Sequence, residues 1–280
     1  MLNILQTIGN TPMVKLKNGL LVKMEGQNPG GSIKDRAALY MIEQAEKRGE
    51  LKKGKIILEA TSGNMGISLA MIGAQKGYKT YIVMSEAMSE ERKTVIRALG
   101  ADLVLTEGSL GTGGAIEKAR EMAKDNSYWF ADQFNNEDNF LAYYHTLALE
   151  ILRDYPGLRF FVAGMGTSGT LMGVAKRMKE DSPKTKIVAV VPPQGYKIQG
   201  VQNQKEDFSS GIYEDGLIDE QVHVSKEDAF SMARKIAREE GLFVGMSSGA
   251  NIFVASKLEG AVTVIPDRGE KYLSTDLFSK

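Results

Sequence analysis

The feature that most constrains the fold of this chain is a regular alternation of two hydrophobic patterns. From about residue 36, segments with apolar residues at helical spacing alternate with short apolar runs such as KIILEA at residues 55–60. Short loops between such elements predict a parallel sheet that helices cover on both faces. The alternation pauses at the polar stretch DQFNNEDNF and resumes after residue 158. We therefore predict two α/β lobes, with the default binding site in the cleft between them.

The composition excludes several classes of protein. The chain has 280 residues, no cysteine, two histidines, and 35 basic and 35 acidic side chains. The absence of cysteine excludes disulfides, thiol nucleophiles and iron–sulfur clusters, and two histidines leave little for a metal site, so we predict none. The zero net charge argues against a nucleic-acid surface. No signal-peptide pattern and no apolar run near the ~20 residues that span a bilayer are present, which predicts a cytoplasmic protein without membrane contact.

A glycine-rich loop at residues 164–170, GMGTSGT, follows the predicted strand RFFVA and opens a helix. Small residues let backbone N–H groups converge at the positive end of the helix, where a phosphate fits. The loop also matches the G-x-G-x-x-G dinucleotide fingerprint, but the next strand ends in Pro192 and Pro193 instead of a carboxylate. We therefore favour a phosphate site over a nicotinamide site or a plain tight turn.

Two further segments open helices. Residues 61–66, TSGNMG, offer hydroxyls, an amide and free N–H groups that suit a carboxylate, although an ordinary N-cap and turn explain them equally well. Lys34 lies at a predicted helix start, where Ser32 and Asp35 have the spacing of a capping box. The helix dipole disfavours a cation there, and burial would lower the pKa of Lys34 and make it nucleophilic. By position alone, an ordinary solvated lysine is the expected interpretation.

Taken together, these motifs resemble the pyridoxal-phosphate (PLP) dependent cysteine synthase family. The resemblance runs in the same order over essentially the whole chain. Its segments are TIGNTP at 7–12, NPGGSIKDR at 28–36, TSGN at 61–64, the loop at 164–170, GMSSGA at 245–250 and YLST at 272–275. Two more segments, DQFNN at 132–136 and DRG at 267–269, place the chain nearest the B-type cysteine synthase.

The resemblance implies a role for individual residues. Lys34 would form the Schiff base with PLP, Asn64 would bind the ring hydroxyl, and Ser247 would face the pyridine nitrogen. The phosphate would lie on Gly166, Thr167, Ser168, Gly169 and Thr170. The substrate α-carboxylate would be held by Thr61, Ser62, Gly63, Met65 and Gln133. No metal is implied.

The family also implies a fold and an assembly. We expect a tryptophan-synthase-β-like α/β fold, PLP fold type II, with two lobes of parallel-type sheets flanked by helices and PLP in the cleft. Residues 35–137 would form the smaller lobe, and residues 1–34 and 138–280 the larger, cofactor-binding lobe. A homodimer is expected. Some relatives bind serine acetyltransferase, but no motif quoted above supports that partner here.

The implied reaction is the replacement of the β-substituent of an O-activated serine, such as O-acetylserine, by sulfide to give cysteine. Lys34 would take the α-proton, and an α-aminoacrylate would form on the cofactor before sulfide adds. Because serine is not acidic, Ser247 would leave the ring nitrogen unprotonated, which favours prompt loss of the leaving group over transamination. The alternatives are another PLP β-lyase, such as a serine or threonine dehydratase or a cystathionine synthase, and an inactive PLP-binding scaffold protein.

Two features depart from the family. Met65 stands where cysteine synthases usually carry threonine, and a thioether cannot donate a hydrogen bond to a carboxylate. The Gly-, Gln- and Asp-rich segment 194–220 predicts a long surface loop, and its part 194–204 lacks the arginine of phosphoserine-using relatives. Lys197 could substitute for that arginine, but O-acetylserine with sulfide is favoured.

Overall fold

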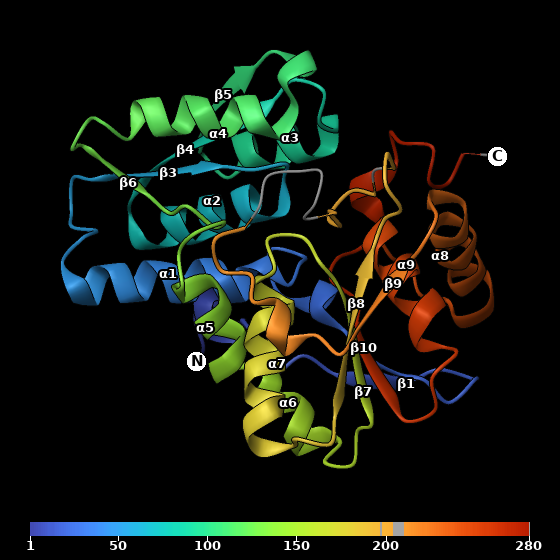
Figure 1. Ribbon diagram of the computed structural model, residues 1–280. Helices are drawn as coiled ribbons and strands as arrows, with labels where there is room; N and C mark the ends of the chain where they lie inside the picture. The colour runs from blue at the N-terminus through green and yellow to red at the C-terminus, as the bar shows by residue number, and fades with distance from the viewer. Residues whose placement is uncertain (197, 204–209, 280) are drawn as a thin grey trace.

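The computed structural model describes residues 1–196, 198–203 and 210–279. Its strands form two separate sheets, as Figure 1 shows. In the six-stranded sheet the order is β1-β2-β10-β7-β8-β9, and in the four-stranded sheet it is β5-β4-β3-β6. Every strand pair is parallel except β1 with β2. The predicted architecture of two parallel-type sheets is confirmed.

The four-stranded sheet is built from one continuous part of the chain. Its strands are β3 (Ile56–Ala60), β4 (Lys79–Ser85), β5 (Asp102–Thr106) and β6 (Tyr128–Phe130). The helix α4 (Gly111–Met122) covers one face and α2 (Asn64–Lys76) the other (Figure 1). The helix α3 (Glu90–Ala98) packs against α2. Alternate side chains of β3 enter different clusters, since Leu58 packs towards α4 and Ile57 towards α2.

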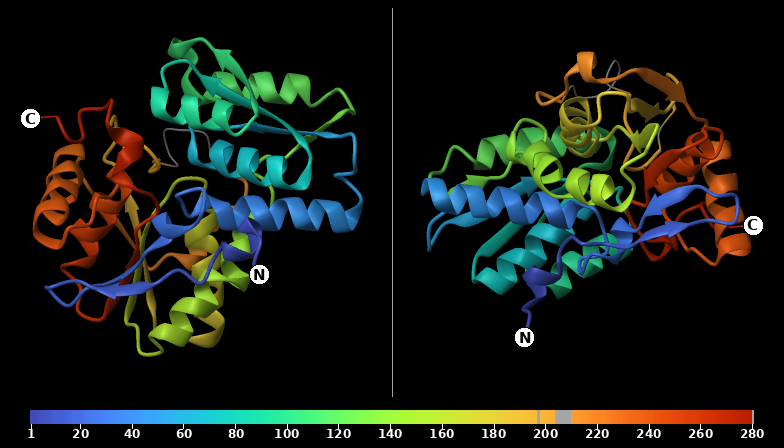
Figure 2. Two further views of the ribbon diagram at one scale, coloured as in Figure 1. Left: turned by 180° about the vertical axis from the view of Figure 1, so that it is seen from behind. Right: turned by 90° about the horizontal axis from the view of Figure 1, so that it is seen from below.

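The six-stranded sheet joins the two ends of the chain. Its strands are β1 (Met13–Lys15), β2 (Leu21–Lys23), β7 (Phe160–Gly164), β8 (Lys186–Val191), β9 (Glu220–His223) and β10 (Ala261–Val264). Because β10 lies between β2 and β7, the N-terminal hairpin and the C-terminal segment are side by side (Figure 2). One face packs on α8 (Lys226–Glu240) and α9 (Met246–Ala255), and the other on α5 (Asp138–His145), α6 (Leu147–Asp154) and α7 (Gly169–Asp181).

The helix α1 (Lys34–Arg48) lies between the two sheets and packs against both α2 and α5. Its first turn is fixed by a buried ion-pair network. Arg36 donates to Glu25 at 2.7 Å and to Glu150 at 2.6 Å, and Lys23 lies 2.9 Å from Glu150. Since removing one partner would leave an uncompensated buried charge, this network holds the start of α1, and with it Lys34, in one place.

Some local predictions are wrong. Asp35 does not cap α1, because its carboxylate accepts instead from the backbone N–H of Gly30, at 2.6 Å, and from the Ser68 hydroxyl. The segment 194–220, predicted as loop throughout, includes a short 3₁₀ helix at Asp215–Leu217, and its last residue begins β9. That edge strand is missed because EQVH carries no apolar run. No helix in the described part of the chain has the length and apolarity needed to cross a membrane.

Candidate active site

Lys34 and the two glycine loops come together where helices begin. The loop 61–66 joins the end of β3 to α2, and the loop 164–168 joins the end of β7 to α7. Lys34 is the first residue of α1, and its Nζ lies 3.1 Å from the Thr167 hydroxyl. A lysine and a phosphate-type loop 133 residues apart in sequence are thus direct neighbours.

The amine of Lys34 lies in buried surroundings, although the residue as a whole is half-buried. Burial lowers the pKa of Lys34 from 10.5 to about 8, while the nearby Glu59 carboxylate acts in the opposite direction. Near neutral pH a useful fraction of the amine is therefore neutral. A neutral lysine amine can attack a carbonyl or take a proton.

The loop 164–170 is shaped by close backbone approaches. A Cβ on Gly166 would lie 2.8 Å from the carbonyl oxygen of Gly200, and one on Gly169 would lie 2.3 Å from Asn139 Oδ1. Ser168 adopts the left-handed conformation, at φ 69°. The first N–H groups of α7 have no intrahelical acceptor, so they can bind an anion at the positive end of this 13-residue helix.

Thr167 is held by a residue that the sequence analysis did not select. Asn139, at the start of α5, donates through Nδ2 to Thr167 Oγ1 at 3.2 Å and to the Gln133 carbonyl at 2.6 Å. Ser210 donates to the Thr167 carbonyl at 2.8 Å. No local pattern distinguishes Asn139 from the other polar residues of DQFNNEDNF, so only the folded chain identifies it.

The loop 61–66 has a different environment. Gly63 adopts φ 152°, and a Cβ there would lie 2.2 Å from Arg92 Cδ. Ser62 is exposed, and the Thr61 hydroxyl accepts from the Gly63 N–H at 3.1 Å. The Met65 side chain is only 1% exposed and belongs to the apolar core. At this position only the backbone N–H is left to face a carboxylate.

Gln133 is buried against Glu59, a carboxylate in the otherwise apolar strand β3. The Gln133 amide donates to Glu59 Oε1 at 3.4 Å and to the Ala60 carbonyl at 3.1 Å. Burial raises the pKa of Glu59 to about 8, although the hydrogen bonds from Gln133 favour its charged form. Both N–H bonds of the amide are thus engaged, so Gln133 must turn its side chain before it can donate to a substrate.

Asn64 and Ser247 are the remaining predicted cofactor residues. The Asn64 amide donates to Asp267 Oδ2 at 2.8 Å and accepts from Lys271 Nζ at 2.9 Å. Ser247, in the first turn of α9, is 6% exposed and faces Gly200, whose carbonyl lies against Gly166. Asp267 was selected from sequence only as part of a family segment, and Lys271 was not selected.

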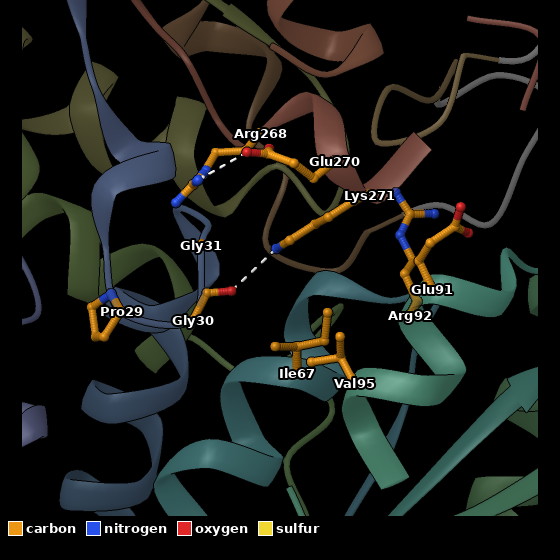
Figure 3. Close-up of a pocket in the computed structure, with 10 residues that line it drawn as sticks. All are labelled: Pro29, Gly30, Gly31, Ile67, Glu91, Arg92, Val95, Arg268, Glu270 and Lys271. Carbon is orange, nitrogen blue, oxygen red and sulfur yellow. Dashed lines mark hydrogen bonds and ion pairs between the residues drawn. The ribbon is translucent and has the colours of Figure 1, made fainter. Parts of the chain in front are cut away.

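A cavity of about 280 Å³ lies beside this group (Figure 3). It is lined by residues of the loop 29–31, of α2 and α3, and of the 3₁₀ helix Gly269–Tyr272. Lys271 lines the cavity and donates to both Gly30 and Asn64. None of the described residues predicted for PLP or substrate is among its lining residues, so it is distinct from the predicted site.

The donor set around Lys34 fits PLP. A buried amine suits its aldehyde, a helix start with hydroxyls suits its phosphate, and an amide and a hydroxyl are ready for the ring oxygen and ring nitrogen. Gly166 and Gly169 leave no room for a Cβ, so the chain passes close to Gly200 and Asn139 where α7 begins.

Comparison with known proteins gives the same result. Residues 4–267 match the family described as pyridoxal-phosphate dependent enzymes. Cysteine synthase B of Escherichia coli (strain K12) is 44% identical over 289 residues, covering 98% of this chain and 95% of that protein.

Two solved structures share the fold. An O-ureido-L-serine synthase superposes with a TM-score of 0.93 at 39% identity, covering 99% of this chain and 95% of that one. A hydrogen sulfide-producing enzyme of Fusobacterium nucleatum gives 0.92 at 41%, covering 98% and 100%. The predicted fold type II and the cofactor PLP are confirmed. The protein is a cysteine synthase-like β-replacement enzyme, a PLP-dependent transferase, and the chain belongs to the PLP-dependent cysteine synthase family.

Proposed function

We propose that this protein makes cysteine by replacing the acetoxy group of O-acetylserine, which leaves as acetate, with sulfide. The observation that carries the proposal is the contact of the buried Lys34 amine with Thr167 of the predicted phosphate loop. That contact brings the expected cofactor lysine to the expected phosphate site, with the loop 61–66 at a neighbouring helix start. Bound PLP supplies the electron sink that makes the α-proton acidic and lets the β-substituent leave.

In this proposal Lys34 first holds the cofactor and then, once the substrate has displaced it, takes the α-proton. The lowered pKa of about 8 leaves part of the amine neutral for that task. Thr167 orients Nζ through their hydrogen bond. Asn64 donates to the ring oxygen, and Ser247 faces the ring nitrogen without protonating it. The phosphate is bound by the loop residues Gly166, Thr167, Ser168, Gly169 and Thr170.

The substrate α-carboxylate binds at the start of α2 in this proposal. Thr61, Ser62 and Gly63 shape the loop, and Met65 contributes its N–H group. Gln133 joins them after its amide turns away from Glu59. The exposed Ser62 hydroxyl leaves this loop accessible to a substrate that must enter and leave in every cycle.

The choice of acetate over phosphate as the leaving group rests on residues 198–203. This described part of the loop, IQGVQN, contains no cation to pair with a phosphorylated serine. Arg92 of α3 reaches this segment, but its guanidinium donates to Gln199. Lys197 and Gln204, which complete the segment considered from sequence, lie outside the described residues.

We also propose that residues 35–137 form a smaller lobe and residues 1–34 and 138–280 a larger one. The four-stranded sheet falls within the first range and the six-stranded sheet within the second, which supports this division. A cytoplasmic homodimer completes the proposal by analogy with the family.

The test is the visible spectrum of the purified protein before and after adding O-acetylserine, followed by sulfide. We expect a yellow protein whose absorption moves to longer wavelength with O-acetylserine, returns with sulfide, and yields cysteine. Pyruvate and ammonia formed from serine without sulfide would instead indicate a dehydratase. A yellow protein that responds to no amino acid would indicate a PLP-binding scaffold.

A further inference from the structure

The Asn64 amide forms hydrogen bonds through both its oxygen and its nitrogen with residues 267–271, which follow β10. Lys271 Nζ donates to Asn64 Oδ1 at 2.9 Å, and Asn64 Nδ2 donates to Asp267 Oδ2 at 2.8 Å. A side-chain amide has an acceptor end and a donor end that are nearly equal in shape. Turning it over would place its NH₂ group against an ammonium and its oxygen against a carboxylate. The two charges therefore select one of the two orientations.

Asp267 is itself fixed in position. It is 1% exposed, and Tyr272 donates its hydroxyl hydrogen to the same Oδ2 atom at 2.7 Å. Its backbone forms an antiparallel bridge with Ser32, two residues before Lys34. A Cβ on Gly245 would lie 2.1 Å from Asp267 Oδ1, so glycine is needed where α9 begins. The carboxylate thus stands between Asn64 and the helix that carries Ser247.

Lys271 has a matching position on the other side of the amide. Besides Asn64, it donates to the Gly30 carbonyl at 3.2 Å, as Figure 3 shows. Burial lowers the pKa of Lys271, while the carboxylates of Asp267 and Asp35 act in the opposite direction. Lys271 therefore connects the loop before the cofactor lysine to the start of α2.

We propose that Asp267 and Lys271 are positioning residues that orient Asn64 towards PLP. The Asn64 nitrogen carries two hydrogens, and Asp267 takes only one of them. The second hydrogen can therefore donate to the ring 3-oxygen. In the reversed amide an oxygen lone pair would face the ring 3-oxygen instead, and no hydrogen bond could form. This inference rests on the proposed role of Asn64 and adds two residues that act on the cofactor only through it.

The test measures resting protein without substrate. Asp267→Ala, Lys271→Met and Asn64→Ala are compared for the visible absorption of bound PLP and for PLP affinity after the cofactor is removed and titrated back. We expect Asp267→Ala and Lys271→Met each to weaken PLP binding about tenfold, on the scale of one charge-assisted hydrogen bond, and to shift the absorption band. Asp267→Asn and Lys271→Arg keep an acceptor and a cation, so both should restore most of the affinity.

Two comparisons separate positioning from general damage. Adding Asp267→Ala to Asn64→Ala should cost no further affinity, because the residue through which Asp267 acts is already gone. Tyr272→Phe removes the other donor to Asp267 Oδ2 but leaves the contact with Asn64 in place, so we expect a smaller loss of PLP affinity than in Asp267→Ala. Thermal unfolding of each apoprotein reports stability separately.

The proposal is overturned if Asp267→Ala and Lys271→Met keep the wild-type spectrum and affinity. It is also overturned if Asp267→Ala weakens binding equally with and without Asn64. If Asp267→Ala does not fold, Lys271→Met and its combination with Asn64→Ala decide in the same way. A wild-type protein that does not respond to O-acetylserine would contradict the proposed function but leave this test unchanged, since no substrate is used.

Discussion

The two glycine loops begin with the same local design and end in different surroundings. Both follow a buried strand of a parallel sheet and both open a 13-residue helix. The loop 164–170 is closed in, because Thr167 accepts from both Lys34 and Asn139 and its glycines meet other backbone and side-chain atoms. The loop 61–66 has an exposed serine and abuts the side chain of Arg92.

This difference shows that a helix start acquires its role from tertiary neighbours. A loop held in place by its neighbours on several sides suits a cofactor that stays bound. A substrate that exchanges in each cycle suits a loop with one open side. Changes in the loop 164–170 should therefore damage cofactor binding, and changes in the loop 61–66 should damage substrate binding.

The largest effect is expected at the lysine that adjoins the closed loop. Lys34→Ala removes both the amine that attaches PLP and the proposed base, so the rate of cysteine formation should fall about a thousandfold or more. Steady-state assays with O-acetylserine and sulfide measure this fall. Normal turnover by this variant would contradict the proposed mechanism.

The next largest effect is expected within the closed loop. In Gly169→Ala the new Cβ would lie 2.3 Å from Asn139 Oδ1, so the loop must move and PLP affinity should fall about a hundredfold, as for one or two lost charged contacts. Titration of apoprotein with PLP measures it. The matched control is Gly113→Ala in α4, where nothing lies within 4 Å of the new atom. Equal losses in both variants would refute the steric argument.

A change in the open loop should affect substrate more than cofactor. Gly63→Ala strains a backbone at φ 152° and meets Arg92 Cδ at 2.2 Å. We expect the KM for O-acetylserine to rise about tenfold while PLP affinity changes less, because the neighbouring Asn64 amide stays held by Asp267 and Lys271. If PLP affinity falls as far as in Gly169→Ala, the proposed division of labour between the loops is wrong.

The smallest effect concerns pH. Because only a neutral amine attacks an aldehyde, the rate at which apoprotein captures PLP should rise with pH, with its midpoint near the Lys34 pKa of about 8. The Glu59 carboxylate raises that pKa, so Glu59→Gln should move the midpoint to lower pH. Stopped-flow absorbance gives the midpoint for the wild type and for Glu59→Gln. The measurement covers roughly pH 6 to 10, the range in which Lys34 and Glu59 titrate. A midpoint that moves upward would contradict this sign.

The sequence was sufficient for elements with strong periodicity and for motifs that are contiguous. Helices such as α1 and α2 and the strand β3 can be predicted from apolar spacing, because the pattern of their buried residues is visible within each segment. The strand β9 and the three-residue strands of the N-terminal hairpin do not, because neighbouring strands define them. The same limit applies to the site, where Asn64 and its partner Asp267 are 203 residues apart.

Met65 illustrates a different limit. From sequence it is a substitution in the substrate site that removes a hydroxyl donor. In the folded chain its side chain packs into the apolar core, and only its backbone N–H is left for a ligand at the start of α2. A sequence position identifies a residue type, but the direction of a side chain depends on the helix that carries it.

The bridge between Ser32 and Asp267 has a consequence for how the protein is made. Translation delivers Asn64 well before its partners, because Asp267 and Lys271 follow it by 203 and 207 residues. Contacts of such long sequence separation form late, and domains fold as their residues emerge. A nascent chain therefore carries a reactive lysine without a finished site around it, and that site is completed only after these distant partners have been synthesised.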